Sequence, residues 1–157
     1  MLIHLLSGKE EPNVVPVNFK NINQVPIINY VQAGLWSGSC DFLDSTVYYY
    51  LQTEINLSEK SFALRIKGNS MEPEFKEEDM IIVDPLVTPI SGEFVVAING
   101  SEEASFKKYR ELGLDEYERM QFELIPLNPD YPKMSSLTQQ IRIIGTMVEH
   151  RTYRRKR

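Results

Sequence analysis

The sequence predicts one mostly β domain whose sheets curl into a barrel-like shape. Seven or eight short apolar segments recur along the 157 residues, and turn-forming residues separate them. The composition is 42% hydrophobic and 25% charged, which is typical of a globular chain and excludes a disordered or fibrous one. No internal repeat is visible, so these segments are expected to build a single sheet system.

The chain divides into an arm, a domain and a tail. Residues 1–24 are expected to form an N-terminal arm, because breaker residues and prolines interrupt their apolar runs. The domain is expected over 25–150. The tail, 151–157, has five basic residues in seven, which indicates either a contact for phosphates or an acidic partner, or a solvated end.

The predicted strands are rich in β-branched and aromatic residues, or they alternate apolar with polar side chains. We expect them at 25–31, 47–51, 62–67, 80–83, 94–98, 104–110, 120–127 and 141–148. Asn99-Gly100 is a strong hairpin signal between two of these segments, so 94–98 and 104–110 are expected to pair.

Charge and cysteine content point to a cytoplasmic protein. The net charge of −5 argues against a surface devoted entirely to nucleic acid. Cys40 is the single cysteine and cannot form an internal disulfide, which fits a reducing compartment. No apolar run approaches the roughly 18 residues of a membrane span, and Met1–Leu6 is too short for a signal-peptide core. We therefore expect no membrane association.

Metal and cofactor chemistry find little support in the sequence. The two histidines, His4 and His150, lie at opposite ends of the chain, and no histidine–cysteine cluster has metal-ligand spacing. No glycine-rich loop of the nucleotide-binding kind is present. We expect neither a metal nor a cofactor.

A serine follows a strongly predicted strand, in the run Gly68–Pro73 (GNSMEP). Pro73 suits the first turn of a short helix. A serine held on such a turn lies beside backbone N–H groups that are free to point at a ligand. The simpler interpretation of Ser70 is that it only caps the helix.

Two lysines lie on the predicted strand at 104–110. Strand alternation sends Lys107 and Lys108 to opposite faces, so one can point inward among apolar neighbours. Burial disfavours the charged ammonium and lowers its pKa, and a neutral lysine can act as general base for a serine. The simpler interpretation is two exposed lysines that protect an edge strand.

In combination these motifs resemble the self-cleaving LexA-type peptidase family, which includes LexA-like and CI-like repressors and UmuD-like polymerase accessory proteins. The resemblance rests on GNSMEP at 68–73, FKEEDMIIVDP at 75–85, SGEFVVA at 91–97, FKK at 106–108, IPLNPDYP at 125–132, IGTMV at 144–148 and VQAG at 31–34. The late loop is closest to the phage-repressor form.

The resemblance implies a LexA-like domain of strongly bent, partly barrel-like antiparallel sheets. It implies Ser70 as nucleophile, and it selects Lys107 as general base because the lysine of the family is followed by another basic residue. The scissile bond would be Ala33–Gly34, within a cleavage segment at 31–36, and backbone amides at Asn69 and Ser70 would stabilise the oxyanion.

The function implied is that of a dimeric transcriptional repressor that cuts itself when a RecA–single-stranded DNA filament stimulates it in the DNA-damage (SOS) response. Repressors of this family begin with a helix-turn-helix domain. The 33 residues before the expected cut are too few for one, so we expect DNA contact only through such a domain, absent here.

Four alternatives remain open at this stage. They are a UmuD-like accessory subunit of a lesion-bypass polymerase, a stand-alone phage or mobile-element regulator, a non-cleaving dimerisation module, and a signal-peptidase-like enzyme. The lack of an apolar membrane anchor disfavours the last of these.

Overall fold

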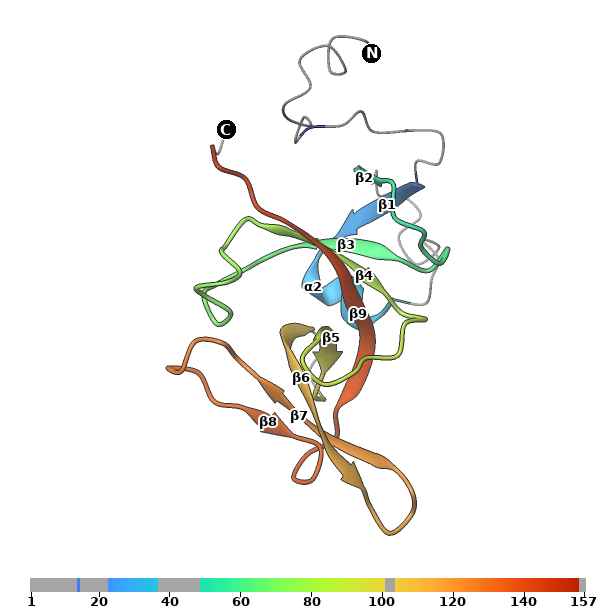
Figure 1. Ribbon diagram of the computed structural model, residues 1–157, viewed down its shortest axis with the longest axis vertical. Helices are drawn as coiled ribbons and strands as arrows, with labels where there is room; N and C mark the ends of the chain where they lie inside the picture. The colour runs from blue at the N-terminus through green and yellow to red at the C-terminus, as the bar shows by residue number, and fades with distance from the viewer. Residues whose placement is uncertain (1–13, 15–22, 37–48, 101–103, 156–157) are drawn as a thin grey trace, which may run out of the picture.

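A computed structural model describes residues 14, 23–36, 49–100 and 104–155 and confirms the mostly β class (Figure 1). Within these ranges, nine strands and one short helix follow each other along the chain. In order they are β1 (Asn23–Ile28), α2 (Tyr30–Gly34), β2 (Tyr50–Thr53), β3 (Phe62–Arg65), β4 (Met80–Asp84), β5 (Phe94–Ile98), β6 (Ser105–Leu114), β7 (Met120–Ile125), β8 (Met134–Ser135) and β9 (Arg142–Arg151).

The strands build one open, strongly bent sheet in the order β2-β1-β3-β4-β9-β5-β6-β7-β8 (Figure 1). The sheet is bent, as expected, but it does not close into a barrel, because β2 and β8 end the sheet without pairing to each other. The sheet is also mixed, since β1 and β3 run parallel whereas the other pairings are antiparallel. The parallel pair arises because α2 and β2 intervene between β1 and β3.

β9 is the strand on which the bend depends. Its first half pairs with β5 and its second half pairs with β4, and the two pairings meet at Thr146. Register shifts interrupt both ladders here, between Ile82 and Val83 on β4 and between Val96 and Ala97 on β5. Such bulges bend a sheet and increase its twist. They explain how β9 passes from one half of the molecule to the other in Figure 1.

The largest core cluster lies inside the bend and joins residues that are far apart in the sheet. It includes buried side chains of β1, α2, β3, β4, β5, β6 and β9, and also Met71 and Phe75 from the turn after β3. The Phe75 ring packs edge-to-face on Phe94 and Phe106, with ring centroids 4.8 Å and 4.9 Å away. Burying a side chain of this size stabilises a fold by roughly 1.5–3 kcal/mol. The turn after β3 is therefore fastened to β5 and β6.

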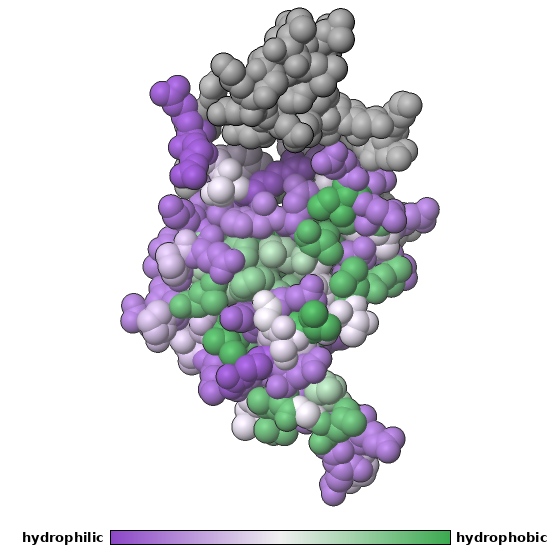
Figure 2. Space-filling view, viewed as in Figure 1, coloured by the Kyte–Doolittle hydropathy of each residue, from purple (hydrophilic) through white to green (hydrophobic). Residues whose placement is uncertain are grey.

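The hairpin of β6 and β7 extends beyond this core. Figure 2 shows hydrophobic residues reaching the surface at this end of the molecule, where Leu112, Leu114 and Tyr117 are exposed. Polar contacts, rather than buried apolar side chains, hold the turn of this hairpin. The carboxylate of Asp115 accepts hydrogen bonds from the backbone N–H groups of Tyr117 and Arg119.

The hairpin predicted from Asn99-Gly100 is confirmed, since β5 pairs with β6 in antiparallel register. Other boundaries differ. The strand expected over 25–31 ends at Ile28, and the chain then turns into helix α2. β1 begins at Asn23, inside the expected arm, and β8 was not predicted because two residues carry too little pattern. Most of the arm, Cys40, and residues 156–157 of the tail lie outside the described residues. No described helix has the length and apolar character to cross a membrane.

Gly145 is predicted to be essential for the bend. A Cβ at this position would lie 2.7 Å from Val83 Cγ1 and 3.0 Å from the backbone nitrogen of Pro85. We expect Gly145→Ala to lower the free energy of unfolding by about 1–3 kcal/mol, the usual cost of overpacking. Urea unfolding measures it, with Glu116→Ala in the exposed hairpin turn as control. A change within about 0.5 kcal/mol, as at ordinary surface sites, would contradict the assignment.

Candidate active site

Ser70 lies in the turn that follows β3. Gly68 has a φ of +78°, a left-handed conformation that glycine adopts without steric cost, and this reverses the chain directly after the strand. The next residue, Met71, is buried, and so is Phe75. Because both pack in the main core cluster, the turn cannot shift without exposing them. Ser70 itself is half-buried at the edge of this core.

The short helix expected from Pro73 is reduced to single turns. The Glu72 N–H donates to the carbonyl of Asn69, and the Phe75 N–H donates to the carbonyl of Met71. No helical segment is assigned between β3 and β4 in the described chain. Ser70 is therefore held by a turn packed on the core rather than by a helix that it caps.

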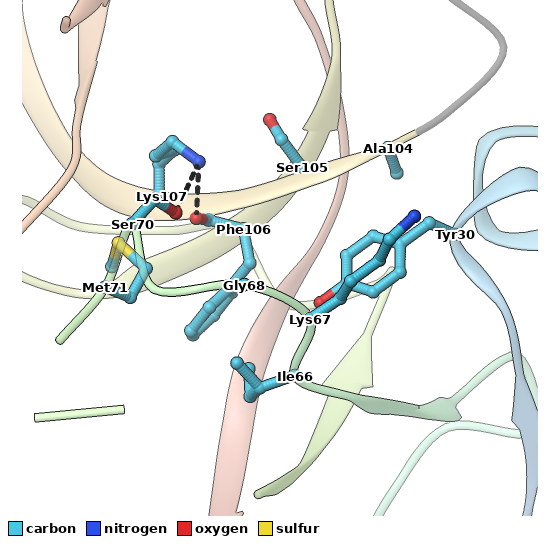
Figure 3. Close-up of a pocket in the computed structure, with 10 residues that line it drawn as sticks. All are labelled: Tyr30, Ile66, Lys67, Gly68, Ser70, Met71, Ala104, Ser105, Phe106 and Lys107. Carbon is cyan, nitrogen blue, oxygen red and sulfur yellow. Dashed lines mark hydrogen bonds between the residues drawn. The ribbon is translucent and has the colours of Figure 1, made fainter. Parts of the chain in front are cut away.

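Lys107 approaches Ser70 from β6, where it is opposite Val95 of β5 in the ladder. Its Nζ donates to Ser70 Oγ at 3.2 Å and to the backbone carbonyl of Phe106 at 3.1 Å, as the dashed lines in Figure 3 show. The contact belongs to Lys107, and strand alternation places its neighbour Lys108 on the other side of the strand. The structure thus brings together the two side chains that the sequence singled out.

Burial lowers the pKa of Lys107, because the ammonium loses the water that would solvate its charge. No described carboxylate forms an ion pair with it to offset this loss. Ile66, Met71 and Phe106 are among the residues that line the cavity bordered by the pair. In its neutral form the amine has a lone pair that can accept the hydroxyl proton of Ser70. This geometry suits general-base activation of an alcohol.

The pair borders a cavity of about 250 Å³. Its walls come from the end of β3, the serine turn, the start of β6 and Tyr30 of α2 (Figure 3). The cavity has room for a short stretch of chain with small side chains. No group of three or more His, Cys, Asp or Glu residues that could hold a metal ion is found among the described residues.

The backbone amides of Asn69 and Ser70 are free for a ligand as far as the described residues go. Neither N–H donates a hydrogen bond to another described group. Backbone donors that point toward a developing negative charge are what an oxyanion site requires.

The expected scissile bond, Ala33–Gly34, lies apart from the Ser–Lys pair. It lies in helix α2 rather than in an open loop, and neither residue lines the cavity beside Ser70. Ala33 is fully buried in the main core cluster, and its carbonyl accepts a hydrogen bond from the Trp36 N–H at 3.2 Å. The structure therefore keeps this peptide bond apart from the Ser–Lys pair.

Several contacts fasten α2 in this position. Asn29 and Gln32 form a reciprocal capping box at its start, with both hydrogen bonds at 2.8 Å. The guanidinium of Arg142, at the start of β9, donates to the Gly34 carbonyl at 3.0 Å. The Ala104 N–H donates to the Tyr30 carbonyl at 3.1 Å. The sequence around Arg142 does not indicate this contact, because the partner residue lies 108 positions away.

A second contribution that sequence reasoning missed comes from the loop after β7. Asn128 and Tyr131 of this loop hydrogen-bond to the serine turn. The loop motif is visible in the sequence as LNPDYP, but nothing local indicates what it contacts.

The structure is thus a bent β domain in which a turn serine contacts a desolvated strand lysine. The family model for Peptidase S24-like proteins matches residues 26–148. The chain belongs to this family, which confirms the resemblance drawn from its motifs.

The curated relatives are bacterial and phage regulators. The chain is 34% identical to prophage repressor CohE of Escherichia coli K12 over 143 residues, which cover 88% of this chain and 60% of that protein. It is 35% identical to repressor protein C2 of Salmonella phage P22 over 130 residues, or 79% and 57% of the two chains. It is 39% identical to the HTH-type transcriptional regulator for conjugative element SXT of Vibrio cholerae over 116 residues, or 69% and 51%. The matches span 51–60% of the length of these three relatives.

The desolvation of Lys107 predicts a pH-dependent stability. The folded-state pKa lies below the ordinary 10.5, so as pH rises between these two values the folded state releases its proton before the unfolded state does. The unfolded state then binds more protons, and the free energy of unfolding rises with pH. We expect Lys107→Met to be more stable than the wild type near neutral pH, with an advantage that shrinks toward pH 10.

Urea unfolding between pH 6 and pH 10 measures this difference. Lys108→Met is the matched control, because it removes the neighbouring lysine of the same strand without touching Ser70. An advantage of Lys107→Met that stays constant across this range would contradict the assigned burial.

Proposed function

We propose that this chain is the self-cleaving C-terminal part of a LexA/CI-like repressor, which cuts its own Ala33–Gly34 bond. Ser70 is the nucleophile and Lys107 the general base. One observation carries the proposal, namely the 3.2 Å contact between Ser70 Oγ and a lysine Nζ from which water is largely excluded. Membership of the Peptidase S24-like family and the repressors among the relatives support it.

In the proposed reaction, neutral Lys107 takes the proton of the Ser70 hydroxyl. The Ser70 oxygen forms a bond to the carbonyl carbon of Ala33, and the electron pair of the carbonyl moves onto its oxygen. The amides of Asn69 and Ser70 donate hydrogen bonds to this oxyanion. The tetrahedral intermediate then collapses, and the carbon–nitrogen bond to Gly34 breaks.

The remaining steps return the dyad to its starting state. Protonated Lys107 gives its proton to the departing Gly34 nitrogen, which becomes a new amino terminus. A water molecule, deprotonated by Lys107, attacks the Ser70 ester. Ala33 leaves as a carboxylate, and Ser70 recovers its proton. Because attack occurs within one molecule, a site too weak for general proteolysis still suffices.

Cleavage requires α2 to unwind and leave its position, since the Ala33 carbonyl is buried and hydrogen-bonded in the helix. We propose that a RecA–single-stranded DNA filament binds the rearranged form and raises its population, which would link cleavage to the DNA-damage (SOS) response. The cut would separate a helix-turn-helix domain from the part of a cytoplasmic repressor that makes it a homodimer. The HTH-type regulators among the relatives support this arrangement.

A second candidate function is a non-cleaving dimerisation module. The burial of Ala33–Gly34 in a capped helix favours it, because an idle dyad would need no access to that bond. A UmuD-like accessory subunit finds less support, since the named relatives are repressors and transcriptional regulators. Self-cleavage distinguishes the first candidate from the second.

We predict that the purified chain cleaves itself during incubation at alkaline pH. The neutral fraction of Lys107 increases with pH, so the rate should increase and then level off below the ordinary lysine pKa of 10.5. Mass spectrometry should find fragments 1–33 and 34–157, with a new amino terminus at Gly34. Ser70→Ala and Lys107→Ala should each lose at least about 10³-fold in rate.

Two variants control this experiment. Ser91→Ala removes the hydroxyl of a serine in the turn before β5, and Lys108→Ala removes the neighbouring lysine; both should cleave at close to the wild-type rate. An intact wild-type chain, with or without RecA filaments, would favour the idle module. Fragments from Ser70→Ala would identify a contaminating protease, and loss of cleavage only in Lys108→Ala would mean that the wrong lysine was chosen.

Release of α2 should also limit the rate. Arg142→Ala removes the hydrogen bond to the Gly34 carbonyl, and a bond of this kind stabilises by about 0.5–1.5 kcal/mol. We therefore expect alkaline self-cleavage to accelerate about 2- to 10-fold in this variant. Arg119→Ala, on the exposed β6–β7 hairpin, is the control. An unchanged or slower rate in Arg142→Ala would mean that this contact does not restrain the segment.

A further inference from the structure

The Ser–Lys pair is assembled from elements that are not neighbours in the sheet. Ser70 follows β3 and Lys107 lies on β6, and three strands, β4, β9 and β5, separate β3 from β6 in the sheet order. The bend brings the two ends together, and Phe75 packs the turn after β3 against Phe94 and Phe106. Phe75 lies five residues after Ser70, so the Oγ–Nζ distance also depends on a closer connection between the serine turn and the lysine strand.

The loop between β7 and β8 makes that connection. β7 pairs with β6, and Ile125 at its end lies opposite Lys108, one residue from the dyad lysine. The chain then crosses from this ladder to the serine turn. Three hydrogen bonds join loop and turn, and each one ends on Asn69 or on Ser70 itself.

Asn128 supplies two of the three bonds. Its backbone N–H donates to the carbonyl of Ser70 at 3.0 Å, and its side-chain Nδ2 donates to the carbonyl of Asn69 at 3.0 Å. One residue thus holds both carbonyls that flank the Cα atom of Ser70, namely those of Asn69 and of Ser70 itself. The Oδ1 atom of the same side chain accepts from the Asp130 N–H at 3.0 Å, which fixes the amide orientation.

Tyr131 supplies the third bond, from its hydroxyl to Asn69 Oδ1 at 2.5 Å. The Tyr131 N–H donates to the Asn128 carbonyl, so the two residues form one unit. The far end of the loop is also fixed. Lys133 pairs with Glu123 of β7 at 3.3 Å, and Glu123 in turn pairs with Arg110 of β6.

We infer that Asn128 and Tyr131 are positioning residues, which hold the Ser70 hydroxyl in reach of Lys107 by tying the serine turn to the β6–β7 ladder. The inference rests on the proposed function. Neither residue lines the cavity beside the dyad, so neither acts on a substrate directly. Their effect passes through the placement of one oxygen atom, and a displacement of about 1 Å there can cost about 10²-fold in rate.

The test compares Asn128→Ala and Tyr131→Phe with the wild type by two readouts. The first is alkaline self-cleavage. The second is labelling of Ser70 by a small fluorophosphonate probe, which reports the reactivity of the hydroxyl and needs no movement of α2. In Asn128→Ala both rates should fall by the same factor, about 10- to 100-fold. This variant loses the side-chain hydrogen bond to the Asn69 carbonyl and the one that the side chain accepts from the Asp130 N–H. Tyr131→Phe, which loses one bond, should lose about 2- to 5-fold in both.

Matched controls are Asn99→Ala, at an exposed turn after β5, and Tyr117→Phe, at the hairpin turn between β6 and β7; both should label and cleave at close to wild-type rates. Thermal unfolding is measured for every variant. A residue with a merely structural role would lower the unfolding temperature yet leave Ser70 labelling unchanged far below that temperature. Tyr131→Phe removes a single oxygen atom and keeps the test decisive if Asn128→Ala does not fold.

The outcomes separate this inference from the proposed function. If the wild type cleaves and is labelled, and both variants do so at the same rate, positioning by the loop is overturned. If cleavage falls in the variants while labelling does not, the loop acts on the cleavage segment and the inference is again wrong. A wild type that neither cleaves nor is labelled overturns the proposed function, and the inference with it.

Discussion

The contact between a lysine amine and a serine hydroxyl, inside a bend and largely without water, is the constraint on which the rest of this structure depends. An ammonium group loses solvation there, and the described residues offer it no carboxylate in return. Such an arrangement is stable only where the surrounding structure provides the free energy. The fully buried strand β4 and the aromatic packing around Phe75 provide it.

The bend itself is the product of one strand with two partners. β9 pairs with β4 along one half and with β5 along the other, and both ladders shift register where the partners change. Gly145 allows the backbone of β9 to approach β4 at this point. The end of β9 is fastened as well, because His150 and Thr152 both hydrogen-bond to buried Asp79. Since the bend brings β3 close to β6, the position of the dyad depends in part on contacts remote from it.

Local pattern predicted most of the strands, marked the turn that holds Ser70 and, through alternation along β6, limited the inward lysine to one of two. It did not choose between Lys107 and Lys108 or assign catalytic roles, which only the family resemblance implied. It failed at α2, where the apolar run 25–31 indicated a strand throughout. The capping box between Asn29 and Gln32 stops the strand, and burial of Ala33 against the core stabilises the helix. Arg142 and Asn128 were missed because their partners lie far along the chain.

Under the proposed function, α2 is a substrate stored in an unreactive form. Its release breaks at least five hydrogen bonds, and four of them fasten the helix to its surroundings or cap its start, namely the two capping bonds, the Arg142 contact and the Ala104–Tyr30 bond. Counting only these four gives a lower bound on the free energy of release. At about 1 kcal/mol for each, the released state lies about 4 kcal/mol above the helix, a population on the order of 10⁻³. Exposure of Ala33, which is fully buried, lowers this population further. A preassembled dyad that meets its bond so rarely cuts slowly by itself. A partner that binds only the released segment raises the population of the released state. It can therefore accelerate cleavage by up to the inverse of the population that exists without the partner.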